Sequence, residues 1–152
     1  MTRSLAISLK IPDNAAFTAL VALRRLGVDV ARVERSEIWE FQSDDSVERL
    51  TARVESDESI FNPNLHRLAV LDRAAPRPGE VWIIPRVEPR VILSPSKDAG
   101  PKAVAWRLFD KSGKPAERDV IASAVERLLC NPAIERAVTA DASDRDNPVV
   151  RQ

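Results

Sequence analysis

The chain has 152 residues, of which 44% are hydrophobic and 30% charged, the composition of a folded globular protein long enough to bury a core. Its 23 basic and 23 acidic side chains balance, so the sequence predicts no nucleic-acid or membrane-surface partner. No apolar run approaches the ~20 residues that cross a bilayer, and no signal-peptide pattern is present. The single cysteine, Cys130, cannot form an internal disulfide, so we expect a cytoplasmic protein.

The first elements predicted are a strand and a helix. Residues 5–11 alternate apolar with small or polar side chains, as a half-buried strand does. Asp13 or Asn14 then supplies a side-chain oxygen for the unpaired first amides of a helix over about residues 15–26. Gly27 is the expected left-handed stop of that helix, because glycine takes positive φ without a Cβ penalty.

A long β-favouring stretch over residues 28–42 follows, and we expect it to bend or break near Ser36 because few strands are so long. Residues 43–45 offer a cap for a second helix, whose apolar positions repeat at helical spacing. Asn62-Pro63 ends that helix, because the residue before proline is disfavoured in helical geometry. Residues 65–71 are then predicted to form a third strand.

The second half begins with a proline-rich middle. Its two β-like runs, residues 81–84 and 91–93, are predicted to be edge strands, since proline cannot donate to a sheet ladder. A strand over residues 103–109 comes next, followed by a helix that starts at Pro115 and ends at Cys130. Asn131-Pro132 breaks this helix, and residues 134–140 form the last predicted strand.

Two segments of the chain echo one another. The two segments are residues 62–70 and residues 131–138. Aligned with one inserted residue in the first, they share an Asn-Pro break, an apolar residue, an arginine and an Ala-Val pair, in that order. Each follows an amphipathic helix and leads into a strand. The repeat predicts an α+β fold of two related halves, with helices packed on one face of an antiparallel sheet.

The ends of both halves resemble a known family. Residues 128–135, which pass from a helix through Asn-Pro, an apolar residue and Glu into a strand, are similar to the C-terminal signature of the PurS family, the small subunit of phosphoribosylformylglycinamidine synthase. Residues 33–41 resemble the family's Val-Arg-Val-Gly-Lys-x-x-Glu-apolar pattern, although Ser36 replaces its glycine and Glu37 its lysine. The chain is also nearly twice the length of an ordinary PurS subunit.

The resemblance implies a division of the chain and a role. Residues 1–74 would be one PurS-like unit, 75–102 a connector with edge strands, 103–140 a second, partial unit and 141–152 a frayed tail. PurS-like subunits are non-catalytic, pair through their sheets into dimers, and bridge a glutaminase to an ATP-dependent amidine synthetase. A fused double unit would therefore mimic a PurS dimer in one chain, as an accessory or scaffold protein in purine biosynthesis.

One strand carries the side chains predicted to meet a partner. Trp39 and Phe41 share one face of that strand, beside Glu37. Together with exposed edge strands they lead us to expect a homodimer, in addition to the glutaminase and synthetase partners that the resemblance implies. The alternative function is a ferredoxin-like module that binds a small molecule or regulates another protein.

Side chains of the usual catalytic types are few. His66 is the only histidine and Cys130 the only cysteine, so no histidine-based triad or metal cluster of ordinary spacing is predicted, nor any cofactor. Cys130 is expected at a helix C-terminus, where the helix dipole would raise the pKa of a thiol. The loop over residues 94–102 contains hydroxyls and lysines that suit an anion, but it lacks the glycine order of a phosphate-binding loop.

Overall fold

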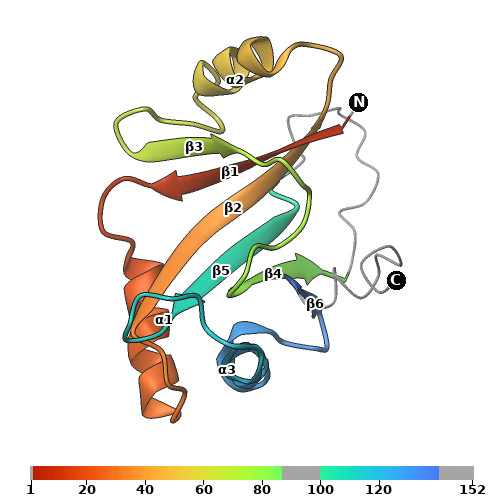
Figure 1. Ribbon diagram of the computed structural model, residues 1–152. Helices are drawn as coiled ribbons and strands as arrows, with labels where there is room; N and C mark the ends of the chain where they lie inside the picture. Colours follow the sequence, from red (N-terminus) through yellow and green to blue (C-terminus); the bar gives the residue numbers. More distant parts are fainter. Residues whose placement is uncertain (1, 87–99, 141–152) are drawn as a thin grey trace.

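The first half of the chain alternates strands with helices in the computed structural model, which describes residues 2–86 and 100–140 (Figure 1). Its elements are β1 (Thr2–Leu9), α1 (Asn14–Arg25), β2 (Arg32–Gln42), α2 (Val47–Glu55) and β3 (His66–Val70). Asp13 caps α1 as expected, because its Oδ1 accepts from the amides of Ala15 and Ala16. Gly27 follows the helix at a φ of 87°, also as expected.

The second half contributes three strands and one helix. Its elements are β4 (Glu80–Pro85), β5 (Ala103–Phe109), α3 (Arg118–Ala124), which continues into the π-helical turn η1 (Val125–Leu129), and β6 (Glu135–Thr139). The run predicted over residues 91–93 lies outside the described residues.

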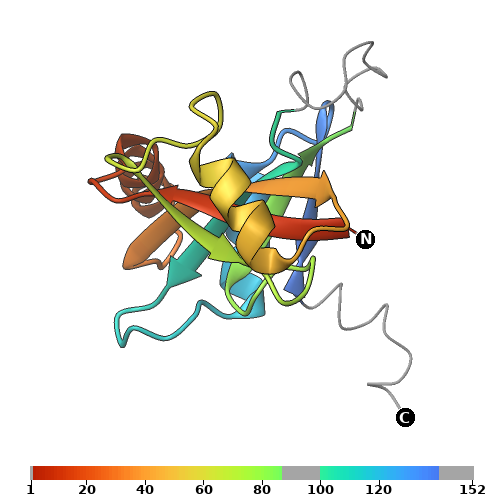
Figure 2. The same ribbon diagram turned by 90° about the horizontal axis from the view of Figure 1, so that it is seen from above.

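All six strands form one antiparallel sheet in the order β3-β1-β2-β5-β4-β6. The helices cover one of its faces, where α2 packs on β1, and where α1 and α3 pack over the centre of the sheet. Figure 2 looks down on α2 where it lies over β1. The predicted α+β class, an antiparallel sheet with helices on one face, is confirmed.

The sheet has internal two-fold symmetry in its pairing. β1 pairs with β2 and β3, β4 pairs in the same way with β5 and β6, and β2 joins β5 at the centre. Leu5 faces Trp39 in the first half, and Val81 faces Trp106 in the second. By this register Glu37 of β2 is equivalent to Val104 of β5, and the two face each other. The pseudo-two-fold axis therefore passes between Glu37 and Val104.

The two Asn-Pro segments form equivalent turns into β3 and β6, as predicted, but only Asn131-Pro132 lies at a helix end, because α2 already ends at Glu55. The Asn62 carbonyl accepts from the His66 amide at 2.8 Å, and the Asn62 amide donates to His66 Nδ1 at 2.8 Å. The Asn131 carbonyl accepts from the Glu135 amide at 2.8 Å, and the Asn131 amide donates to Glu135 Oε1 at 2.9 Å. The strand register then makes Ala69, which faces Ala6, equivalent to Val138, which faces Trp82, so the predicted one-residue insertion is wrong.

The residues that directly follow β1 and β4 contact these turns in the same way. Lys10, directly after β1, donates Nζ to the Pro63 carbonyl at 2.8 Å. Arg86, directly after β4, donates Nε to the Pro132 carbonyl at 2.8 Å. Two segments 69 residues apart thus carry the same turn, at opposite edges of one sheet.

Several predicted boundaries need correction. β4 is an interior strand rather than an edge strand, because Pro85 is its last residue and Pro76 and Pro78 precede it, so no proline removes a central amide. β2 runs through Ser36 without a break, because pairing with β1 and β5 on its two sides holds it extended. The second half of the sheet accordingly begins with β4, before residue 103.

The helix ends also differ from prediction. Ser46, not residues 43–45, caps α2 by accepting from the Arg49 amide at 3.2 Å. α3 begins at Arg118 rather than Pro115, which instead forms an isolated bridge with Phe109. The extra residue in the turn of η1 buries Leu129 and leaves Leu128 exposed.

Candidate functional site: an arginine-lined cleft

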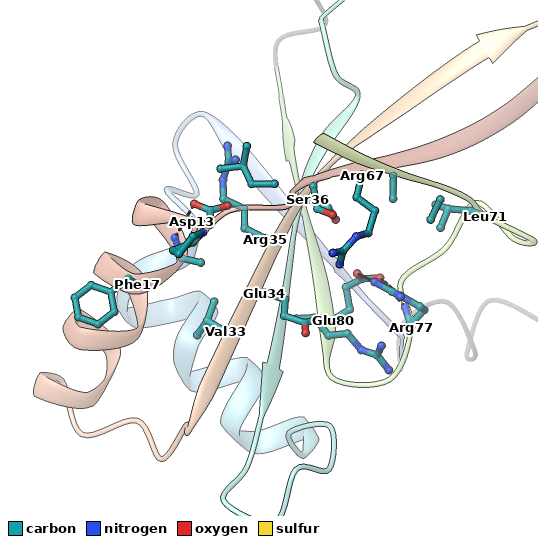
Figure 3. Close-up of a pocket in the computed structure, with 17 residues that line it drawn as sticks. Asp13, Phe17, Val33, Glu34, Arg35, Ser36, Arg67, Leu71, Arg77 and Glu80 are labelled. Carbon is teal, nitrogen blue, oxygen red and sulfur yellow. Dashed lines mark hydrogen bonds and ion pairs between the residues drawn. The ribbon is translucent and has the colours of Figure 1, made fainter. Parts of the chain in front are cut away.

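A cleft of about 470 Å³ opens beside β1, β2 and β3 (Figure 3). Small side chains on the helix-free face of the sheet form its floor, among them Ala6 and Ser8 of β1, Ser36 of β2 and Ala69 of β3. At one end it reaches the N-terminus of α1, where Phe17 lines it. Pockets that bind small molecules commonly measure about 300–1,000 Å³. The cleft is therefore large enough for a metabolite.

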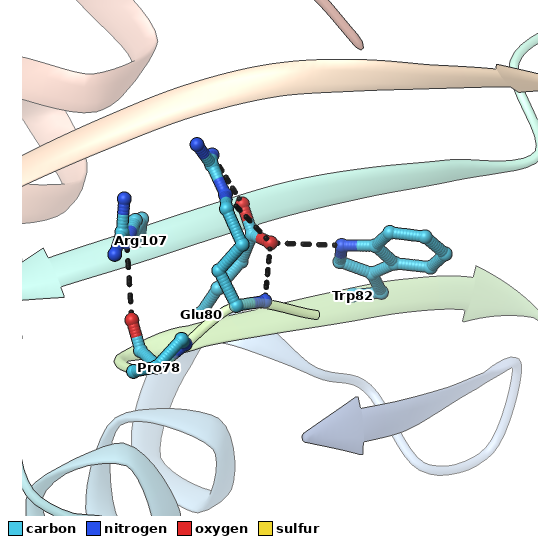
Figure 4. A network of polar contacts seen from close by, with 5 residues as sticks. Pro78, Glu80, Trp82 and Arg107 are labelled. Atoms are coloured by element: carbon cyan, nitrogen blue, oxygen red, sulfur yellow. Dashed lines mark hydrogen bonds and ion pairs between the residues drawn. The ribbon is translucent and has the colours of Figure 1, made fainter. Parts of the chain in front are cut away.

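Four arginines line this cleft: Arg35 of β2, Arg67 of β3, Arg77 in the connection before β4, and Arg107 of β5. Arg67 extends from its strand toward Glu80 and Arg77 (Figure 3). Among the described residues, no hydrogen bond or ion pair engages the exposed Arg67 side chain. Arg107 donates Nε to the Pro78 carbonyl at 3.0 Å (Figure 4). The guanidinium groups thus differ in how far the protein itself satisfies them.

Glu80 is the buried anchor of one wall, with only 3% of its surface exposed. Its Oε1 accepts from the Arg77 amide at 2.9 Å and from the Trp82 indole at 3.2 Å, and its Oε2 pairs with the Arg77 guanidinium at 2.9 Å (Figure 4). The hydrogen bond to Glu80 raises the pKa of Arg77 against the opposing effect of burial. A buried carboxylate with this many donors is stable and fixes Arg77 in place.

Arg107 carries a charge that its surroundings compensate only in part. Its neighbours across the strands are Glu34 of β2 and Glu80 of β4, yet neither forms an ion pair with it within 4 Å. Burial lowers the pKa of Arg107, and the nearby positive charge of Arg77 lowers it further. An added negative charge in the cleft would stabilise the guanidinium of Arg107.

The side chains predicted to meet a partner lie instead on the helix-covered face. Trp39 and Phe41 do share one face, and their rings stack with centroids 6.3 Å apart. Both pack beside Leu50 and Val54, and Trp39 Nε1 donates to Glu37 Oε1 at 3.4 Å. All three predicted residues are half-buried. Their role at a partner interface stays a prediction.

His66 and Cys130 both make contacts within the fold, His66 at a turn and Cys130 against the core. His66 accepts from the Asn62 amide and lies 5.7 Å from the Phe61 ring. Burial raises the pKa of the Cys130 thiol, and the charge of Glu135 raises it further, so the expected direction is correct but burial is the larger cause. Because β3 and β6 are opposite edges of the sheet, His66 and Cys130 do not meet.

Other predicted features give no second site. Within residues 2–86 and 100–140, no cluster of three or more histidine, cysteine or acidic side chains could hold a metal ion. Most of the loop predicted to suit an anion, residues 94–99, lies outside the described residues, and Lys102 at its end pairs with Glu40 at 2.7 Å. In the described part of the chain, no helix has the length and apolarity to span a membrane.

Comparison with known proteins identifies no relative: no family model, no curated protein and no solved structure matches this chain. The cleft was also not predicted from the sequence. Arg67 is the arginine of the repeated Asn-Pro segment, but Arg77 and Arg107 belong to no motif, and only the pairing of five strands brings the three together. The only sequence cue was weak: small residues alternate along residues 4–8, on the face that becomes the floor.

Proposed function

We propose that the protein is a non-catalytic, PurS-like accessory protein that acts as a scaffold, in purine biosynthesis, for a glutaminase and an ATP-dependent synthetase. The observation that carries this proposal is the pseudo-two-fold axis between Glu37 and Val104, where β2 and β5 join two related units. PurS-like subunits pair through their sheets, so one chain with two joined units would present the surface of such a dimer.

The chemistry of the chain supports an accessory role. Glutamine hydrolysis of the usual type needs a cysteine thiolate beside a base. Cys130 has a raised thiol pKa, and His66 stands at the other side of the sheet with Nδ1 occupied by the Asn62 amide. A protein of this kind would contribute by positioning partners that contain the reactive groups.

The test is reconstitution. Ammonia release and ADP formation are measured with the purified protein alone, and then with a glutaminase and a synthetase of the phosphoribosylformylglycinamidine synthase type. We expect no turnover by the protein alone and stimulation of the mixture. Turnover by the isolated protein that disappears in Cys130→Ser or His66→Ala would contradict the non-catalytic role. Failure to bind or stimulate either enzyme would remove the purine role.

A second candidate function is a small-molecule-binding or regulatory module, and the arginine-lined cleft favours it. The cleft has the volume of a ligand pocket and polar groups converging from β3, β5 and the connection before β4. The two functions are compatible, because the floor of the cleft and the predicted partner residues Trp39 and Phe41 lie on opposite faces of the sheet.

A further inference from the structure

The internal symmetry provides a comparison between the two halves of the same chain. In the register of the sheet, Ala6 faces Ala69 in the first half, and at the equivalent place Trp82 faces Val138 in the second. These positions point to the helix-free face in both halves. Trp82, 2% exposed, fills the second half at the place where the first half has alanine.

The next position along the strands repeats the contrast. Ser8 faces Arg67 in β3, whereas Ile84 faces Arg136 in β6. The two halves share the Asn-Pro turns, the strand pairing and this arginine, but only the first half has small residues beneath it. The small-residue floor of the cleft, formed by Ala6, Ser8 and Ala69, is therefore a difference between the two halves.

The acidic side chains of the cleft are engaged with neighbours. Glu80 accepts from Arg77 and Trp82. Glu34 pairs with Arg32 at 3.3 Å. Asp13 accepts from the first amides of α1. Of the four arginines, Glu80 holds Arg77, and Arg35 lies over the Trp106 ring with its Cζ 5.8 Å from the centroid. Arg67, with no hydrogen bond or ion pair among the described residues, and Arg107, with no ion pair, are therefore the groups left to meet a ligand.

We propose that the cleft binds a small organic anion, with its carboxylate or phosphate held by Arg67 and Arg107 and its carbon body against the small-residue floor and Phe17. Planar guanidinium groups form paired, charge-assisted hydrogen bonds to both kinds of oxyanion. The Arg77–Glu80 pair is a fixed wall, because Glu80 already holds Arg77. This inference rests on the second proposed function and names the class of ligand.

Calorimetric titration with three aromatic probes at constant ionic strength tests the proposal: phenyl phosphate, benzoate and the neutral benzyl alcohol. We expect one or both anions to bind at least about tenfold more tightly than the alcohol, since a hydrogen bond to a charged group commonly contributes that much. The preferred anion distinguishes a phosphate ligand from a carboxylate ligand.

The symmetry supplies a matched control. Arg67→Gln is expected to weaken anion binding about tenfold or more, whereas Arg136→Gln, at the equivalent position of β6, should leave it unchanged. The double variant Ser8→Ile and Ala69→Val copies two of the three differing floor residues, Ile84 and Val138, from the second half into the first. It should abolish binding of the aromatic probes by filling the floor.

Each other outcome overturns the inference in a recognisable way. Equal loss in Arg67→Gln and Arg136→Gln would mean that surface charge, not the cleft, attracts the anions. Binding of benzyl alcohol as tight as that of the anions would retain a ligand pocket but refute the oxyanion site. No binding of any probe at about 10 mM, a concentration well above a millimolar Kd, would refute both the anion site and the small-molecule function.

Discussion

Gly79, the residue before β4, should be among the least replaceable in the chain. Its φ is 76°, and an added Cβ would lie 2.7 Å from the Pro115 Cβ and 2.9 Å from the Leu108 carbonyl oxygen. A non-glycine residue in left-handed geometry costs about 1–2 kcal/mol, and overpacking adds about 1–3 kcal/mol. The gain from restricting the unfolded chain offsets only about 0.4–1 kcal/mol. We therefore expect Gly79→Ala to lower the free energy of unfolding by about 2–4 kcal/mol.

Gly113 provides the control, because its φ is 84° and no atom lies within 4 Å of the place that an added Cβ would take. Gly113→Ala should lower the free energy of unfolding by only about 1 kcal/mol. For a chain of this size each kcal/mol moves the Tm by about 2–4 °C, so Gly79→Ala should melt roughly 4–16 °C lower and Gly113→Ala roughly 2–4 °C lower. Calorimetric melting measures both. Equal shifts would refute the steric reasoning at Gly79.

Three further predictions concern a turn, the repeat and assembly. Hydrogen bonds from Ser112 and Lys114 lower the pKa of the Asp110 carboxyl below its ordinary value of 3.8. The stability that the ionised carboxylate gives the fold is therefore present at neutral pH and is lost as the pH falls through the folded-state pKa. A carboxyl NMR titration that gives a value at or above 3.8 would contradict this. In each turn the asparagine Oδ1 accepts from the amide two residues later, so Asn62→Ala and Asn131→Ala should each lower the free energy of unfolding, measured with urea, by about 1 kcal/mol. The double variant should lose about the sum, because the turns lie at opposite edges of the sheet. A double variant as stable as one of the single variants would refute their independence. The expected homodimer is tested by light scattering, where a monomer at high micromolar concentration would rule it out.

The features that follow from local physics were predictable. The cap at Asp13 and the stop at Gly27 depend on a few neighbouring atoms, and both are as predicted. The Asn-Pro repeat correctly indicated two equivalent turns, because each asparagine makes its hydrogen bonds within the next four residues. Strand Ala103–Phe109 has the predicted bounds, since its apolar residues are bounded by turn residues on both sides.

Predictions that depended on the position of a strand in the sheet were less successful. The sequence alone does not show that β2 has partners on both sides, and those partners keep it straight through Ser36. The prolines around β4 suggested an edge, but they lie at its ends, where the ladder tolerates them. The cleft was missed for the same reason, because Arg67 and Arg107 meet only through the order of the strands.

The repeat separates what the fold needs from what it can vary. Two features that recur in both halves are structural. In each half an asparagine closes a turn onto the first residue of the next strand. A basic side chain, Lys10 in one half and Arg86 in the other, donates to the carbonyl of the proline after that asparagine. The helix-free face differs between the halves, since Trp82 stands where Ala6 stands in the other half, and both side chains belong to one buried cluster. Beside that cluster the small residues Ser8 and Ala69 leave space, and Arg67, Arg77 and Arg107 line it. That space, beside guanidinium groups whose charge the protein compensates only in part, is the physical reason for proposing a ligand there.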